Sequence, residues 1–173
     1  MDMPTNKQGS DVRWVVMGVS GCGKSTVGKA LAAALDVPFV EGDEYHPEAN
    51  VTKMSAGFAL TDIDRAEWLA SLTTQIRAAA QNGNGLVVSC SALKRRYRDL
   101  LREGDAQLRF AHLCGDKEII SARMQARIGH YMPPSLLDSQ LRDLESLQND
   151  EAGISLHIGT APAQLVEQIL AHA

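Results

Sequence analysis

The sequence lacks the features that mark secreted, membrane-spanning and nucleic-acid-binding proteins. Its three cysteines, Cys22, Cys90 and Cys114, are odd in number and widely spaced, which argues against a disulfide framework and a zinc knuckle. No apolar run approaches the about 20 residues that span a bilayer, and the polar segment 1–11 has no signal-peptide core. The net charge of -4 provides no overall basic field for nonspecific nucleic-acid binding. We therefore expect a protein of the reducing cytoplasm with neither a nucleic-acid nor a membrane partner.

The residue pattern predicts one domain built on a parallel sheet. The chain has 173 residues, of which 45% are hydrophobic, and it suits a single domain over 12–173 after a disordered tail over 1–11. Short runs rich in valine and isoleucine alternate with segments of helical period, as in α/β proteins with crossover helices. We predict five strands, at 14–18, 38–41, 86–89, 109–114 and 155–158. The predicted helices lie at 24–35, 62–82 (with Asp62 as N-cap), 93–103, 117–127, 135–147 and 161–171, and the connections 42–61 and 128–134 are candidate binding loops or lids.

A glycine-rich loop directly follows the first predicted strand. The run Gly18-Val19-Ser20-Gly21-Cys22-Gly23-Lys24-Ser25 matches G-x-x-x-x-G-K-[ST], in which glycines let successive backbone N–H groups point at phosphate oxygens. The following helix adds the positive end of its dipole, Lys24 reaches the terminal phosphates, and the Ser25 hydroxyl can ligate Mg²⁺. The loop therefore predicts binding of a nucleoside triphosphate such as ATP, with these residues and Thr26 as its contacts.

The loop alone does not define the phosphoryl acceptor, because GTPases, ATPase motors and small-molecule kinases share it. The third predicted strand ends Ser89-Cys90-Ser91 without the usual carboxylate, and the guanine motif N-K-x-D is absent, so a small kinase with its acid elsewhere is favoured. Glu41 and Asp43 end the second predicted strand, at the carboxyl edge where open α/β sheets bind ligands. Asp43 can deprotonate an attacking hydroxyl or hold Mg²⁺, and Glu41 can share the second task. The alternative is that Asp43 only caps a helix.

Three motifs resemble those of the gluconate kinase family, in the same order and without an obvious gap over the region from Val15 to Leu147. The first runs Glu41-Gly42-Asp43-Glu44-Tyr45-His46-Pro47 and continues with Asn50, Lys53-Met54, Gly57, Leu60, Asp62, Asp64-Arg65 and Trp68-Leu69. The second is Cys90-Ser91-Ala92-Leu93-Lys94 followed by Tyr97-Arg98-Asp99-Leu100-Leu101-Arg102. The third, Gly129-His130-Tyr131-Met132-Pro133, resembles the lid motif of the family.

The resemblance implies a three-layer α/β/α P-loop kinase with a five-stranded parallel sheet and a helical lid, related to shikimate and nucleotide kinases. It implies transfer of the ATP γ-phosphate to the 6-hydroxyl of D-gluconate, giving 6-phospho-D-gluconate, by a Mg²⁺-dependent homodimer. The substrate-binding region is then expected over 42–70 and the lid over 123–138. Two alternatives stay open: another small-metabolite kinase of the shikimate or nucleotide kinase type, and a nucleotide-binding module without catalysis.

Gluconate offers one carboxylate and a row of hydroxyls, so its site needs a cation and several polar partners. Arg65 is the first candidate for the carboxylate, with His46, Lys94 and Arg98 as nearby donors. Each has an alternative interpretation: Arg65 as a solvated helix residue, His46 as a loop histidine, and the basic run from Lys94 to Arg102 as a charged helix face.

Two arginines are candidates for the transferring phosphoryl group. Arg123 and Arg127 lie four residues apart on one predicted helix, so both can project toward the lid, and Arg123 is expected to contact the nucleotide. Arg127 adjoins the lid and is preferred as the residue that neutralises developing charge. His130 can close over the substrate, although Gly129 beside it can equally end a helix. The predicted catalytic residues are Lys24, Asp43 and Arg127, and the predicted metal ligands are Ser25, Glu41 and Asp43.

Overall fold

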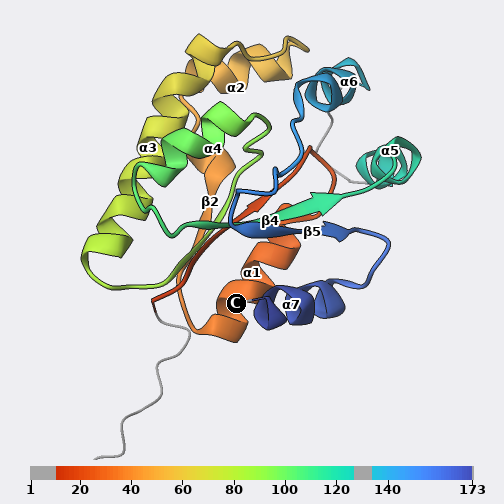
Figure 1. The fold of residues 1–173 in the computed structure, drawn as a ribbon. Coiled ribbons are helices and arrows are strands. Elements are labelled where there is room, and N and C mark those ends of the chain that lie inside the picture. Colours follow the sequence, from red (N-terminus) through yellow and green to blue (C-terminus); the bar gives the residue numbers. More distant parts are fainter. Residues whose placement is uncertain (1–10, 127–133, 173) are drawn as a thin grey trace, which may run out of the picture.

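The computed structural model describes residues 11–126 and 134–172 and contains a five-stranded parallel sheet (Figure 1). The strands lie in the order β2-β3-β1-β4-β5, so that β1 is central. Their bounds are Arg13–Met17 (β1), Phe39–Glu41 (β2), Leu86–Ser89 (β3), Arg109–Cys114 (β4) and Gly153–His157 (β5). The predicted five-stranded parallel sheet is therefore confirmed.

Helices cover both faces of this sheet (Figure 1). On one face lie α1 (Lys24–Leu35) and α7 (Pro162–Ala171), and on the other lie α3 (Asp62–Gln81) and α4 (Arg95–Arg102). The chain leaves β1 through α1 and β3 through α4, on opposite faces, so the carboxyl ends of these two neighbouring strands form the topological switch point of the sheet. Beyond the carboxyl ends lie α5 (Lys117–Ala126) and α6 (Pro134–Asp143). The predicted three-layer α/β/α fold is confirmed.

The central strands are buried on both faces, which explains why their sequences are continuously apolar rather than alternating. In β1, all four residues from Trp14 to Met17 are at most 1% exposed, and Val87 and Val88 in β3 are completely buried. The core against α3 is made by Trp68, Leu69, Leu72 and Ile76, which form one stripe on that helix. The sheet is thus held rigidly from both sides, and the loops at its carboxyl edge start from fixed points.

The predicted strands agree with the structure to within two residues, and the predicted start and end of α1 are those observed. One prediction is wrong. The N-cap of α3 is Thr61 rather than Asp62, because the Thr61 hydroxyl accepts from the Asp64 N–H (3.2 Å) while the Asp64 carboxylate accepts from the Thr61 N–H (2.8 Å). The connection 42–61, a candidate binding loop, contains two helices that the sequence pattern had not indicated, the 3-10 helix η1 (Gly42–Tyr45) and the helix α2 (Glu48–Ser55). Within α2 only Asn50 is buried, so no apolar stripe signals this helix in the sequence.

Two predicted segments lie largely outside the described residues: the tail over 1–11, apart from Asp11, and the connection 128–134, apart from Pro134. Between residues 11–126 and 134–172, no helix is both long enough and apolar enough to cross a bilayer.

Gly42 lies where η1 packs tightly against the end of β3. Its N–H donates to Ser89 Oγ (3.2 Å) and its carbonyl accepts from Trp68 Nε1 (2.8 Å). A β-carbon on Gly42 would overlap the backbone carbonyl oxygen of Ser89. The absence of a side chain here lets Glu41 and Asp43, on either side, sit directly over the carboxyl edge of the sheet.

We predict that Gly42→Ala lowers the free energy of unfolding by about 3 kcal/mol, because the added methyl group has no space beside β3. The matched control is Gly83→Ala: Gly83 has a positive φ of 66°, but a β-carbon there meets nothing within 4 Å. This control should lose only about 1 kcal/mol, the cost of the left-handed backbone. Urea denaturation of both variants measures the difference, and equal losses would contradict the steric account of Gly42.

Candidate active site

The glycine-rich loop connects β1 to α1 at the centre of the sheet. Gly23 is the N-cap of α1 and has a positive φ of 92°, and without a side chain it leaves the first N–H groups of the helix directed toward the loop. Lys24 folds back over this loop, with its Nζ donating to the Val19 carbonyl oxygen at 3.1 Å. The Cys22 side chain is buried beneath the loop, 1% exposed, so Cys22 can face a phosphate only through its backbone. The loop and helix end form a candidate anion site, with Lys24 as its cation.

An acidic group stands beside this anion site. The Glu41 carboxylate accepts hydrogen bonds from the Ser25 hydroxyl and from Ser89 Oγ, the latter at 2.6 Å. Asp43, two residues further on, is exposed and lines the same cavity as Lys24. The three predicted metal-ligand residues, Ser25, Glu41 and Asp43, thus lie in one region at the carboxyl end of β2.

This oxygen set fits Mg²⁺ held mainly by a nucleotide. Magnesium in kinases keeps several waters and binds one or two protein oxygens together with substrate phosphates. The Ser25 hydroxyl and the Glu41 carboxylate, already in contact at the start of α1, are hard oxygen donors of this kind. No cluster of three or more histidine, cysteine or acidic side chains able to hold a metal alone occurs in the described parts of the chain.

A cavity of about 350 Å³ extends from the phosphate loop to α3. Lys24 and Asp43 line it on the loop side, and His46, Arg65 and Trp68 line it on the side of α3. Val51 and Met54 of α2 and Leu136 of α6 add apolar wall. The cavity therefore combines Lys24 of the glycine-rich loop, a carboxylate and a buried cation, the kind of convergent polar groups that small-molecule sites contain.

Arg65 is the buried cation of this cavity, 6% exposed. Its Nη1 donates to the Tyr97 hydroxyl (2.9 Å), and that hydroxyl donates in turn to the Asp62 carboxylate. The Tyr97 hydrogen bond is the main cause that holds the pKa of Asp62 below its usual range. Asp143 of α6 lies 3.6 Å from Arg65 Nη1, which is too far for a hydrogen bond. Arg65 is therefore oriented by its hydrogen bond to Tyr97 and pairs with the Asp143 carboxylate only at this longer distance.

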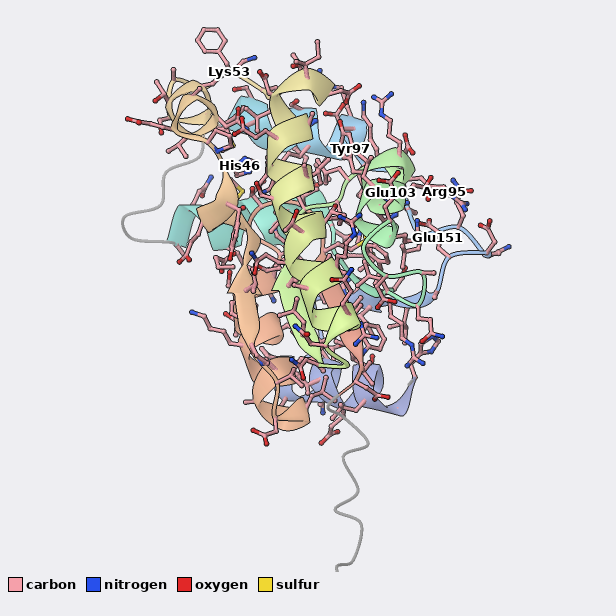
Figure 2. The ribbon with its side chains drawn as sticks, turned by 90° about the vertical axis from the view of Figure 1, so that its left-hand side faces the viewer. His46, Lys53, Arg95, Tyr97, Glu103 and Glu151 are labelled. Atoms are coloured by element: carbon pink, nitrogen blue, oxygen red, sulfur yellow. The ribbon has the colours of Figure 1, made fainter. Side chains whose placement is uncertain are left out.

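His46 faces the cavity from the loop after η1. Its ring stacks on Trp68, with the centroids 4.0 Å apart and the planes at 18°, and its Nδ1 lies 3.2 Å from Asn50 Nδ2. Burial lowers the pKa of His46 to about 4, with Asp43 acting in the opposite direction and Arg65 in the same one. His46 is therefore a neutral imidazole near neutral pH, able to donate and accept hydrogen bonds. Figure 2 shows His46 on one side of α3 and Tyr97 on the other.

Three functional residues had not been predicted: Trp68, Tyr97 and Gln140. Trp68 lies three residues after Arg65 on α3, so the helical period could have placed it beside the cavity. Gln140 of α6 accepts from the Ser20 N–H (2.7 Å) and donates from Nε2 to Ser20 Oγ (3.1 Å), joining α6 to the phosphate loop. No local signal reveals a contact across 120 residues.

The remaining predicted residues occupy different places. Lys94 turns toward Asp62, with Nζ 3.6 Å from the carboxylate, and is not among the residues that line the cavity. Arg123 of α5 donates to the Ile158 carbonyl (2.7 Å), and its Nη1 lies close to Gly23 of the phosphate loop. Arg127 and His130 lie outside the described residues.

The prediction that Arg98 contacts the substrate is corrected by its position. The Arg98 side chain is completely buried and forms a bidentate ion pair with the buried carboxylate of Glu151, at 2.7 and 3.0 Å. It faces the core between α4 and the segment before β5 rather than the cavity. The sequence predicts Arg98 on a solvated or ligand-facing surface. The structure buries it instead, because it pairs with the Glu151 carboxylate 53 residues away.

A phosphate loop at the switch point of a parallel sheet, open to a cavity with a carboxylate and a buried arginine, defines a P-loop kinase of the small-molecule class. Comparison with known proteins agrees. The sequence model of the shikimate kinase family matches residues 20–171. The gluconokinase of Gluconobacter oxydans (strain 621H) is 47% identical over 158 residues, covering 91% of this chain and 89% of that protein.

Two crystal structures are also similar. A sugar kinase from Janibacter sp. HTCC2649 has a TM-score of 0.88 at 47% identity, covering 92% of each chain. A gluconokinase from Sinorhizobium meliloti 1021 has a TM-score of 0.85 at 44% identity, covering 94% of this chain and 91% of the other. The chain belongs to the gluconokinase family, within the shikimate kinase-like group of P-loop kinases.

We predict that the free energy of unfolding falls as the pH is lowered from about 6.5 to about 5. Burial lowers the pKa of both His46 and His112 to about 4. The unfolded chain, with ordinary histidines, binds protons over this interval that the native state does not, so acid favours unfolding. Urea denaturation at a series of pH values measures the slope.

The variant His46→Gln should reduce that slope, because a histidine with a lowered pKa is gone. The control is His172→Gln, which alters an exposed histidine at the end of α7 and should leave the slope unchanged. An unchanged slope in His46→Gln would contradict the assignment of a neutral His46 in the native state.

Proposed function

We propose that this protein is an ATP-dependent gluconokinase, which transfers the γ-phosphoryl group of ATP to the 6-hydroxyl of D-gluconate and releases 6-phospho-D-gluconate and ADP. One observation carries the proposal: a single cavity is lined by Lys24 and Asp43 beside the phosphate loop and by the buried Arg65 on α3. The names of the related gluconokinases support the choice of substrate.

The nucleotide is assigned to the loop over 18–26. Its backbone N–H groups and the N-terminus of α1 would bind the β- and γ-phosphates, and Lys24 would leave the Val19 carbonyl to reach the transferred group. Ser25 and Glu41 would hold Mg²⁺, with Asp43 near it. When bound, this ion neutralises phosphate charge and so lowers the barrier to attack. Arg123, already against the loop and the Ile158 carbonyl, would add a further positive charge at the nucleotide.

The acceptor is assigned to the α3 side of the cavity. The buried guanidinium of Arg65 would bind the gluconate carboxylate, where low solvent exposure strengthens a charged hydrogen bond. The neutral ring of His46 would bind a hydroxyl, and its Trp68 stacking partner would hold that ring in place. Asp43 would orient the 6-hydroxyl and accept its proton during the attack. The charges of Asp43 and Arg65 both act on His46, so these three side chains share one region.

The lid is assigned to 123–138, from the end of α5 to the start of α6. Arg127 would neutralise the transferring phosphoryl group and His130 would close over the substrate. Support comes from the described ends of this segment: Arg123 lies beside Gly23, and Leu136 lines the cavity. A homodimer in the cytoplasm, as the resemblance to the family implies, is part of the same proposal.

The choice of acceptor is tested by a coupled ADP-release assay across D-gluconate, D-glucitol, shikimate and nucleoside monophosphates. We expect gluconate to be the preferred acceptor. Glucitol matches its row of hydroxyls but lacks the carboxylate, so it should lose at least about 10²-fold in kcat/KM because it cannot form the charged hydrogen bond with Arg65. Turnover of shikimate or a nucleotide in preference to gluconate would overturn the proposal.

We predict that Asp43→Asn lowers kcat about 10²- to 10⁴-fold, because the amide cannot accept the proton of the attacking hydroxyl. The Kd for ATP, measured by calorimetry without gluconate, should stay within about twofold, because the phosphate loop is unchanged. The matched control is Glu44→Gln on the same turn of η1, which removes an exposed carboxylate next to Asp43. Equal kcat values in the two variants would remove Asp43 from the mechanism.

A further inference from the structure

Arg98 makes more contacts than a simple ion pair requires. Besides the two bonds to Glu151, its Nη1 donates to the backbone carbonyls of Ala92 (2.9 Å) and Leu93 (3.4 Å), and its Nη2 reaches the Ser146 carbonyl (3.4 Å). The guanidinium is planar and offers five N–H groups in a fixed fork, so one side chain can hold a carboxylate and a turn at once. Arg98 thus joins the segment before β5 to the turn that follows β3.

Glu151 is the anchor that holds Arg98 in place. Its carboxylate also accepts from the Gln148 N–H (2.8 Å) and from Arg102, and these bonds with Arg98 hold its pKa below the ordinary range although burial alone would raise it. A buried ion pair costs desolvation, which is offset only when the remaining donors and acceptors are also satisfied. The backbone carbonyls of the turn provide this satisfaction for Arg98. Figure 2 shows Glu151 beside α4.

The turn held by Arg98 has a strained backbone. Ala92 has φ of 44°, in the left-handed region that costs a residue with a β-carbon about 1 kcal/mol or more. Its methyl group is completely buried, so it cannot move outward to relieve this strain. A conformation of this kind persists only when the surrounding structure imposes it. The Arg98 bond to the Ala92 carbonyl is a contact that does so.

This turn forms part of the active site. The Ser91 carbonyl accepts from the N–H of Gly18, the first glycine of the phosphate loop (3.3 Å). Ser91 and Leu93, on either side of Ala92, both line the cavity. The turn therefore connects the end of β3 to the start of the phosphate loop, and its conformation affects where that start lies relative to the cavity wall.

We propose that Arg98 is a positioning residue for phosphoryl transfer: anchored on Glu151, it holds the left-handed turn at Ala92 and thereby fixes Ser91 against the phosphate loop and Leu93 against the acceptor. Arg98 touches neither substrate. Displacement of this turn would misalign donor and acceptor, and a misplacement of about 1 Å can cost about 10²-fold in rate. The inference rests on the proposed function only for the acceptor used in the assay.

The test compares Arg98→Lys with Arg102→Lys. Lysine at 98 can keep a charge near Glu151 but cannot span both the carboxylate and the turn carbonyls. Arg102 contacts the same carboxylate, Asp99 and the Phe110 ring. Within the described residues it has no hydrogen bond to the turn, so its replacement perturbs the Glu151 carboxylate without removing a bond to the turn. Both variants are assayed where circular dichroism shows complete folding, and rates are expressed per folded molecule.

We expect Arg98→Lys to lower kcat/KM for gluconate at least about tenfold, through a lower kcat and a higher acceptor KM, with Arg102→Lys within about twofold of wild type. A merely structural Arg98 would change the unfolding midpoint and neither kinetic constant, and that result would overturn the inference. If Arg98→Lys does not fold, the test uses Glu151→Gln, which weakens the ion pair that anchors Arg98. Its kcat/KM should then be at least about threefold below that of Arg102→Lys. Equal kcat/KM values in Glu151→Gln and Arg102→Lys would overturn the inference.

Failure of the proposed function gives a different result. It appears as a wild-type protein that does not phosphorylate gluconate, whereas failure of this inference appears as an Arg98 variant that matches the wild type. If the wild type prefers another acceptor from the panel, the same comparison is made with that acceptor.

Discussion

The carboxylate of Glu41 joins three elements at the edge of the sheet where the cavity lies. Glu41 is the last residue of β2. Its carboxylate accepts one hydrogen bond from the Ser25 hydroxyl at the start of α1 and another from the Ser89 hydroxyl at the end of β3. Ser89 Oγ accepts in turn from the Gly42 N–H, and the Gly42 carbonyl accepts from Trp68 Nε1. The Trp68 ring stacks on His46. A continuous series of contacts therefore runs from the phosphate helix to the acceptor side of the cavity.

Much of the fold could be predicted because its signals are local. The central strands are buried on both faces, so they appear in the sequence as short apolar runs, and the phosphate loop has fixed residue types at fixed spacing. The helix α2 could not be predicted in this way, because it buries only Asn50 and has no apolar face. For the site, the loop, Asp43, His46 and Arg65 were candidates from motif and position, and the structure places all of them at one cavity. The contact of Gln140 with Ser20 depends on tertiary packing that no motif encodes.

In the basic stretch over 94–102, the charge of a residue alone does not predict whether its side chain lies on the surface or in the core. Arg95 pairs with Asp150 on the surface, and Arg96 and Lys94 both approach Asp62. Arg98, three residues after Arg95, lies toward the core and has no exposed surface. Which of these cations is buried depends on the position of Glu151, and that position is set by the pairing of β5 with β4. A uniform run of charge in the sequence thus separates into surface ion pairs and one buried ion pair.

The helix α6 touches both halves of the cavity. Gln140 reaches the phosphate loop at Ser20, and Asp143, nearly one helical turn later, lies 3.6 Å from Arg65. A phosphate bound at the Ser20 N–H would displace Gln140, and an anionic acceptor bound at Arg65 would compete with Asp143. One short helix therefore bears a contact to each half of the cavity. If both ligands act on this helix, thermodynamic linkage requires that donor and acceptor alter each other's affinity by the same factor.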